Sequence, residues 1–241
     1  FVWVLFQQFE LSYMWLYTLG GGVAVLIVLF CWQSFPLFPE KVTQTKKIIL
    51  RKRYWLYYAL QFMSGARRQI FVVFAGFLMV EKFEFTVAEI SMLLIANAAI
   101  NVVFAPKIGR LIQRFGERKS LIFEYIGLSL IFAGYAFVES SHFAVFLYIA
   151  DHLFFSIAIA LKTYFQKIAD PADIASSSGV SFTINHIAAV FIPVAFGLVW
   201  LSSPSLVFLA GSGMAIVSLI LALNMPSKPA FGNEVLLGKF S

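Results

Sequence analysis

The segment Pro106–Lys119, with the sequence PKIGRLIQRFGERK, separates two long apolar stretches of the chain. Five of its fourteen residues are Lys or Arg. Because loops on the cytoplasmic side of a membrane carry an excess of Lys and Arg, this segment is predicted to be a cytoplasmic loop. Gly109 and Gly116 would allow a tight turn there, since glycine lacks the Cβ that crowds neighbouring helix ends. The orientation of this loop fixes that of every membrane span around it.

The composition indicates an all-α polytopic membrane protein. Hydrophobic residues make up 61% of the 241 residues and charged residues 12%, whereas about 25% of residues are charged in ordinary soluble domains. Runs of about 20 apolar residues, enough for a helix to cross a bilayer, recur along the chain. The net charge of +6 does not indicate nucleic-acid binding, because the basic residues gather between the apolar runs.

Seven apolar runs are long enough to be membrane-spanning helices. Pro36 and Pro39 end the first run, because proline lacks the N–H that continues a helix. Thr86 and Glu89 have the spacing of a capping box and mark the start of the third. The predicted spans are residues 11–30, 54–80, 86–105, 120–138, 143–165, 179–201 and 206–223.

The basic residues are distributed unevenly between the two sides of this seven-span arrangement. Of the 18 Lys and Arg residues, only Lys82 falls in a loop on the outer side, and Arg67, Arg68 and Lys162 fall within spans. The others lie in the opposite loops and in the tail, which the excess of positive charge identifies as cytoplasmic. The C-terminus is therefore predicted to be cytoplasmic.

The pattern G-x-L-x-x-R-x-G-x-R-K, which starts at Gly109, resembles the signature loop of the major facilitator superfamily. In that family the loop joins the second and third helices of each six-helix half. Gln113 stands where the family usually has Asp, so a charge relay through that Asp is not available in this chain. Such a departure is typical of the second half. The candidate residues of this conformational motif are Gly109, Arg110, Arg114, Gly116, Arg118 and Lys119.

The resemblance covers nearly the whole chain and implies a six-helix bundle preceded by one additional transmembrane helix. It assigns the last helix region of an N-terminal half, the central cytoplasmic loop, the C-terminal bundle and a cytoplasmic tail to residues 1–35, 36–53, 54–225 and 226–241. Because the sequence begins with Phe1, we expect it to be a piece of a longer protein. The expected partners are the lipid bilayer and the N-terminal half of the same transporter, and the expected location is a bacterial inner membrane.

One face of the second span carries a polar stripe, because spacings of three and four residues place side chains on the same side of a helix: Tyr57, Gln61, Ser64 and Arg68. A charged residue inside a membrane is costly and is a functional candidate by default. The fork of donors on arginine suits a carboxylate or phosphate of a substrate. The alternative is a structural ion pair with an acidic residue on another span, which gains weight for Arg67, turned about 100° from Arg68.

Asp151 and His152 in the fifth span are the candidates for proton coupling. A carboxyl in low dielectric can hold a proton, and imidazole titrates near neutral pH. The alternative is that Asp151 only neutralises Arg67 or Arg68, since a buried charge needs a partner. Lys162, near the cytoplasmic end of this span, is expected to extend its amine to the membrane surface.

Asn185 and His186 in the sixth span are candidates to line the path of a solute. The alternative, favoured for His186, is a hydrogen bond between helices, which polar residues commonly make in membranes. Glu124, near the start of the fourth span, is expected to balance the basic loop beside it.

No enzyme, metal site or cofactor is predicted, because the sequence lacks a phosphate-binding glycine loop, an HExxH motif and paired cysteines. The family works by alternating access, and the resemblance implies that the second, fifth and sixth spans line the cavity. Together with the arginines in those spans, this predicts a secondary transporter for a small organic anion, with proton coupling. The alternative is a non-transporting scaffold, accessory subunit or assembly factor that keeps the fold within a larger membrane complex.

Overall fold

The computed structural model describes residues 13–35, 42–45 and 47–238. The expected start of the first span at residue 11, and parts of the expected central loop and tail, lie outside these residues. Within them, seven helices are long and apolar enough to cross a membrane. The predicted all-helical membrane fold is therefore confirmed.

The chain divides into two compact units, residues 1–41 and 42–241. In the first unit, α2 (Tyr13–Ser34) is an unbroken helix that passes through the glycines at positions 20–22. Large apolar side chains such as Leu26 and Phe30 are exposed along it. Such a helix suits lipid, because its internal hydrogen bonds satisfy the backbone groups that lipid cannot.

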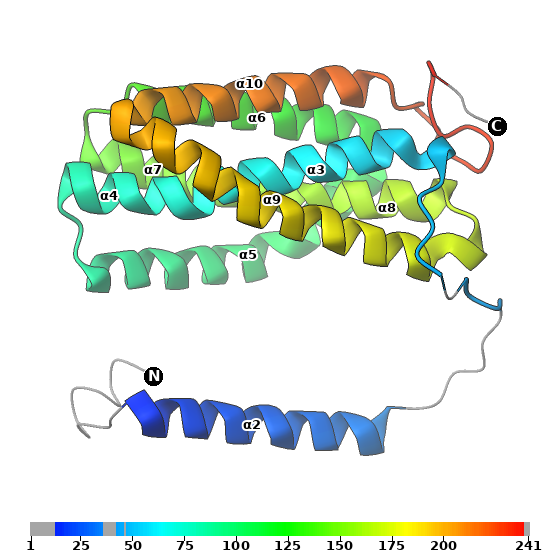
Figure 1. Ribbon diagram of the computed structural model, residues 1–241, viewed down its shortest axis with the longest axis horizontal. Helices are drawn as coiled ribbons and strands as arrows, with labels where there is room; N and C mark the ends of the chain where they lie inside the picture. Colours follow the sequence, from blue (N-terminus) through cyan, green and yellow to red (C-terminus); the bar gives the residue numbers. More distant parts are fainter. Residues whose placement is uncertain (1–12, 36–41, 46, 239–241) are drawn as a thin grey trace. The chain divides into compact units, whose positions relative to one another are not determined.

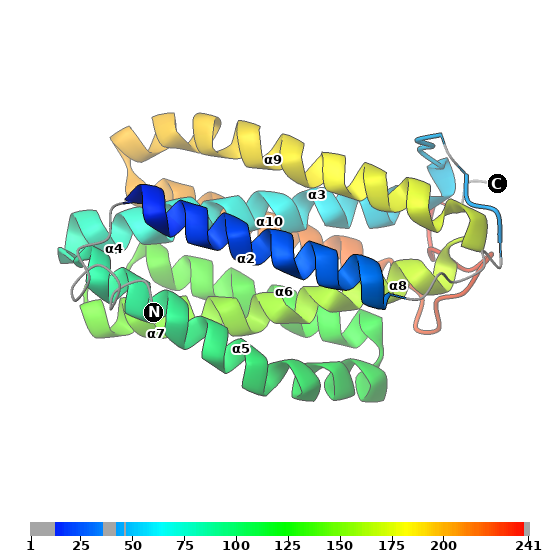
Figure 2. The ribbon, with the colours of Figure 1, turned by 90° about the horizontal axis from the view of Figure 1, so that it is seen from below.

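The other six candidate spans lie in the second unit, and three of them are built from more than one helical segment (Figure 1). In Figure 2, α5 and α9 lie at opposite sides of this unit, with the other helices between them. The segments are η1 (Lys52–Tyr54), α3 (Trp55–Gln69), η2 (Ile70–Ala75), α4 (Gly76–Phe83), α5 (Val87–Phe115), α6 (Glu117–Ala136), α7 (Ser141–Phe155), η3 (Ser156–Ala158), α8 (Ile159–Ile168), η4 (Pro171–Asp173), α9 (Ile174–Ser202) and α10 (Pro204–Leu223).

Two spans depart from regular α-helix next to their charged residues. The π-helical segment η2 starts two residues after Arg68, at the junction of α3 and α4. The 3₁₀ turn η3 starts four residues after His152, at the junction of α7 and α8. Interruptions of this kind are frequent at functional sites, because they re-aim side chains within a helix.

The segment 106–119 is helical except at Gly116, so the prediction of a loop there is wrong for all its other residues. Helix α5 continues through Pro106 to Phe115, and the chain turns at Gly116, which has φ +82°. The helix continues because Ile108 and Ile112 extend an apolar face that is buried in the bundle. At the other end of α5, the predicted capping box is confirmed, since the Thr86 hydroxyl accepts from the Glu89 N–H and the Glu89 carboxylate accepts from the Thr86 N–H.

One end of the second unit, called the basic end below, gathers residues 47–53, the Gly116 turn, the 170–173 turn and residues 225–238. The segment after α10 folds back across this end. The Tyr164 hydroxyl donates to the Glu234 carbonyl over 2.6 Å, and Arg118 donates to the Leu223 carbonyl over 2.8 Å. These contacts fasten α8 and α6 to the residues that follow α10.

Candidate functional site

A cavity of about 650 Å³ lies among α3, α8 and α9 and is called the cation cavity below. Binding sites for small molecules in proteins have volumes of this order, with a few polar groups that converge on the ligand. The polar side chains that line the cavity are Gln61, Ser64, Arg68, Gln69, Lys162, Asn185 and His186. The cavity therefore brings together four of the six residues predicted to bind substrate.

Two cations, Arg68 and Lys162, face the cation cavity, and none of the described residues that line it is a carboxylate. Both side chains are exposed. In the part of the chain that the structure describes, neither cation lies within ion-pair distance of a carboxylate. The Arg68 guanidinium instead lies over the Phe155 ring, 5.6 Å from its centroid. The cavity thus has an excess of positive charge, which is the arrangement that attracts an anion.

The shape of the cation cavity depends on a close approach between α3 and α9 at Gly65. A Cβ at this position would lie 2.6 Å from the Asn185 Oδ1, so a larger residue would displace the amide. Beside it, the His186 ring packs 4.0 Å from the Phe182 ring, and its Nδ1 lies 2.9 Å from the Phe182 carbonyl. Glycine therefore lets α9 present its polar groups directly against the stripe on α3.

Tyr57 belongs to the same stripe by spacing but does not line the cation cavity. Its hydroxyl accepts from the Ser181 hydroxyl over 2.8 Å, and its ring stacks on Phe165 with centroids 4.2 Å apart. Helices α8 and α9 therefore close over the first turn of the stripe, and the cavity begins at Gln61.

Arg67 lies in a second site, called the sealed cluster below, which comprises Arg67, Glu124 and Asp151. These three residues are at most 1% exposed. The Arg67 Nη2 lies 4.0 Å from the Glu124 Oε1, and the guanidinium lies 4.5 Å from the centroid of the Tyr125 ring. Arg67 does not line the cation cavity. Its geometry matches the alternative interpretation, an ion pair with an acidic residue on another span.

The charges of the sealed cluster do not balance when all its groups are ionised. One guanidinium faces two carboxylates, because Glu124 experiences the charges of both Arg67 and Asp151. The three guanidinium nitrogens, both Glu124 oxygens and the Asp151 Oδ1 have no hydrogen-bond partner among the described residues. One carboxyl must therefore hold a proton or another cation, since an isolated buried charge is far costlier than a neutral group.

The predicted role of Glu124 as a partner of the basic loop is wrong. Glu124 is fully buried opposite Arg67. The acidic residue that pairs with a lysine at the basic end is Glu117, in the first turn of α6, whose Oε1 lies 2.5 Å from the Lys167 Nζ. The sequence held a signal for this, because Glu124 follows Glu117 by seven residues and shares its helix face with the buried Leu121 and Leu128.

His152 stands between the two sites. It is half-buried, follows Asp151 directly, and lies close enough to Arg68 to experience its charge. Its ring packs against Phe71, with centroids 5.3 Å apart, and its Nδ1 has no hydrogen-bond partner among the described residues. The predicted proton-coupling pair therefore consists of one sealed residue and one residue at the boundary.

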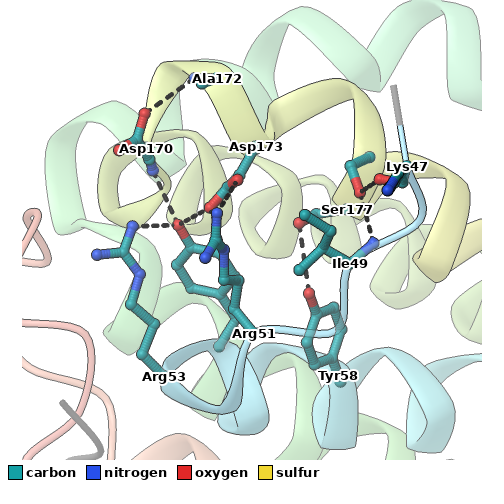
Figure 3. A network of polar contacts seen from close by, with 11 residues as sticks. Lys47, Ile49, Arg51, Arg53, Tyr58, Asp170, Ala172, Asp173 and Ser177 are labelled. Carbon is teal, nitrogen blue, oxygen red and sulfur yellow. Dashed lines mark hydrogen bonds and ion pairs between the residues drawn. The ribbon is translucent and has the colours of Figure 1, made fainter. Parts of the chain in front are cut away.

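A polar network at the basic end joins the residues before α3 to the turn before α9 (Figure 3). Arg51 donates two hydrogen bonds of 3.0 Å to the Asp173 carboxylate. These bonds and the negative charge of Asp173 raise the pKa of the Arg51 guanidinium above its ordinary value. The Tyr54 hydroxyl donates to Asp173 and accepts from the Asp170 N–H. Nothing in the sequence analysis predicted this network, because its partners lie more than 100 positions apart.

The residues of the conformational motif lie at this same end, but they do not form one loop. Gly109 is helical within α5, Arg110 and Arg114 project from its last turns, and Gly116 forms the turn. Lys119 is exposed on α6. Arg118 contacts the end of α10 through the Leu223 carbonyl and the Ser227 hydroxyl.

Comparison with known families adds one finding. The sequence profile described as Major Facilitator Superfamily matches residues 4–193. The matched range includes α2, the sealed cluster and every residue that lines the cation cavity. No curated protein matched the sequence.

Proposed function

Because this chain belongs to the Major Facilitator Superfamily, a family of secondary transporters, we propose that it moves a small organic anion across a membrane by alternating access, coupled to protons. The observation that carries the proposal is the cation cavity, whose two positive side chains have no acidic partner among the described residues. A guanidinium donates in a fork that matches carboxylate and phosphate. Arg68 is the residue we assign to the anionic group of the substrate.

The amides around Arg68 complete the proposed substrate site. Gln61 and Asn185 enter the cavity from α3 and α9, and each offers one donor group and one acceptor. The close contact at Gly65 brings these two helices together. In alternating access, movement of the C-terminal bundle against the N-terminal half would open this site to one side of the membrane at a time.

The sealed cluster supports proton coupling, since its second carboxyl needs a proton when Arg67 pairs with the first. Asp151 is the carboxyl we assign to the transported proton, because Glu124 lies opposite the guanidinium. His152 is the residue we assign to proton transfer to and from Asp151, because it follows Asp151 directly and its Nδ1 has no hydrogen-bond partner among the described residues. Transport of the anion would then alter the charge that His152 and Asp151 experience.

We also propose the orientation and the boundaries that the sequence predicts. The basic end would face the cytoplasm of a bacterial cell, together with the C-terminus. Residues 1–35 would belong to an N-terminal half, 36–53 to the central loop, 54–225 to the C-terminal bundle and 226–241 to the tail. The competing proposal of a non-transporting scaffold or assembly factor does not need a cavity of this size.

The test is flux in proteoliposomes that contain the complete transporter. Radiolabelled lactate, succinate and glycerol 3-phosphate would be offered with and without an inward proton gradient. We expect uptake of at least one of these anions, its stimulation by the gradient, and its loss in Arg68→Ala. Lys228→Gln, which removes an exposed cation of the C-terminal segment, is the matched control and should leave uptake unchanged. Absence of anion uptake in the wild type would contradict the proposal and favour the scaffold.

A further inference from the structure

Lys162 has no role in the function proposed so far, yet it lines the same cavity as Arg68. We propose that the cation cavity binds a dianion, with one anionic group on Arg68 and the other on Lys162. This inference rests on the proposed transport of organic anions and narrows it to a substrate class: small molecules with two negative charges, either two carboxylates or one phosphate monoester.

The contrast between Lys162 and Lys167 supports this role. Both lysines lie on α8, five residues apart. Lys167 lies 2.5 Å from the Glu117 carboxylate, whereas Lys162 has no carboxylate within ion-pair distance among the described residues. Lys162 also forms part of the cavity wall with Arg68 and Asn185, a position that the sequence alone did not predict for it. Lys167 is therefore paired with a carboxylate of the protein, whereas Lys162 is available to a ligand.

The charge of the cavity sets the charge of the ligand. Two cations that line one cavity repel each other, and an anion bound between them relieves this repulsion. A monoanion would leave one positive charge unbalanced, whereas a dianion neutralises both. Because Arg68 and Lys162 come from different helices, α3 and α8, a ligand with two separated anionic groups would also bridge them.

The amides suit the remainder of such a ligand. Gln61, Gln69 and Asn185 line the cavity and can donate to carboxylate or phosphate oxygens and accept from hydroxyl groups. No acidic side chain among residues 13–35, 42–45 and 47–238 lines the cavity, so a zwitterion would find no carboxylate partner for its ammonium group in this lining. These features together favour a short polar dianion over an amino acid or a fatty acid.

The test uses the complete transporter in proteoliposomes and pairs of probes that differ only in charge. Succinate is compared with succinamate, a monoanion of the same length, and glycerol 3-phosphate is included as a phosphate monoester. We expect the wild type to take up a dianion at least about tenfold more efficiently than succinamate. Lys162→Gln should remove this preference while uptake of succinamate persists, and Lys162→Arg should keep it. Lys228→Gln is the control for loss of a positive charge outside the cavity.

The outcomes separate this inference from the proposed function. Equal uptake of succinate and succinamate by wild type and Lys162→Gln, with both lost in Arg68→Gln, would overturn the dianion while anion transport stands. Failure of the wild type to take up any of the three probes would overturn both. A preference for succinate would identify dicarboxylates, and a preference for glycerol 3-phosphate would identify phosphate monoesters; either supports the inference if Lys162→Gln removes it.

Discussion

Arg67 and Arg68 are neighbours in sequence with the same side chain, but they lie in opposite environments. Arg67 is 1% exposed and pairs with Glu124 across the bundle, whereas Arg68 is exposed in the cation cavity. A helix turns about 100° per residue, so adjacent positions face different partners. A charge within a span therefore has two distinct uses. The presence or absence of an acidic partner separates the charge that holds the bundle together from the charge left for a ligand.

Replacing each arginine by methionine should produce the largest difference in stability between the two sites. Arg67→Met leaves two buried carboxyls without their cation and should lower the free energy of unfolding by about 3–5 kcal/mol. Arg68→Met removes an exposed side chain and should change it by at most about 0.5 kcal/mol. Unfolding of the detergent-purified transporter by heat and denaturant measures both. Equal losses would show that the two arginines do not differ in this way.

Neutralising Asp151 of the sealed cluster should remove proton coupling while transport of the anion continues. Asp151→Asn leaves Arg67 and Glu124 as a balanced pair, so the cluster no longer needs a proton. We expect a proton gradient to stop driving anion accumulation, while exchange of anion across the membrane without a gradient stays within about twofold of the wild type. Measurements of anion accumulation at imposed pH differences test this.

Asp170→Asn is the matched control for that experiment, because it removes a carboxylate at the basic end and keeps the side-chain oxygen that accepts from the Ala172 N–H. Accumulation that still follows the proton gradient in Asp151→Asn would rule out the sealed cluster as the coupling site.

The network at the basic end differs from the cation cavity, since the Asp173 carboxylate accepts from both the Arg51 guanidinium and the Tyr54 hydroxyl. Tyr54→Phe removes the hydroxyl that joins Asp173 to the Asp170 N–H, and should lower the free energy of unfolding by about 1 kcal/mol. Tyr58→Phe removes only one contact, of 3.3 Å, to Ser177 and should have a smaller effect. Anion flux per folded molecule should not change in either variant, and a large loss of flux would assign this network a part in the transport cycle.

Hydrophobic runs and loop charge were sufficient to predict the spans and their number. Their ends were harder, as α5 shows. The density of Lys and Arg in residues 106–119 favoured a loop, but Ile108 and Ile112 bury one face of the helix while Arg110 and Arg114 project from it. A helix that leaves the membrane can be charged on one side and packed on the other. The rule that cytoplasmic loops are rich in Lys and Arg accounts for the charged side of this helix and gives no information on its buried side.

Much of the candidate site followed from helical spacing, which placed Gln61 and Arg68 on one face. Spacing alone did not reveal that Tyr57 would be covered by α9 or that Lys162 would enter the cavity, because both depend on how neighbouring helices approach. The buried Glu124 is similar: its partner Arg67 lies 57 positions away. Contacts between helices are set by the packing of whole faces, and single positions do not encode them.

The most direct test of the central claim, that Arg68 is free for a ligand while Arg67 is not, is equilibrium binding of succinate to the purified complete transporter. Titration calorimetry would compare the wild type, Arg68→Gln and Lys228→Gln. We predict that Arg68→Gln weakens binding at least about 100-fold, or about 2.8 kcal/mol, and that Lys228→Gln binds as the wild type does. Succinate binding by Arg68→Gln with the affinity of the wild type would contradict the account.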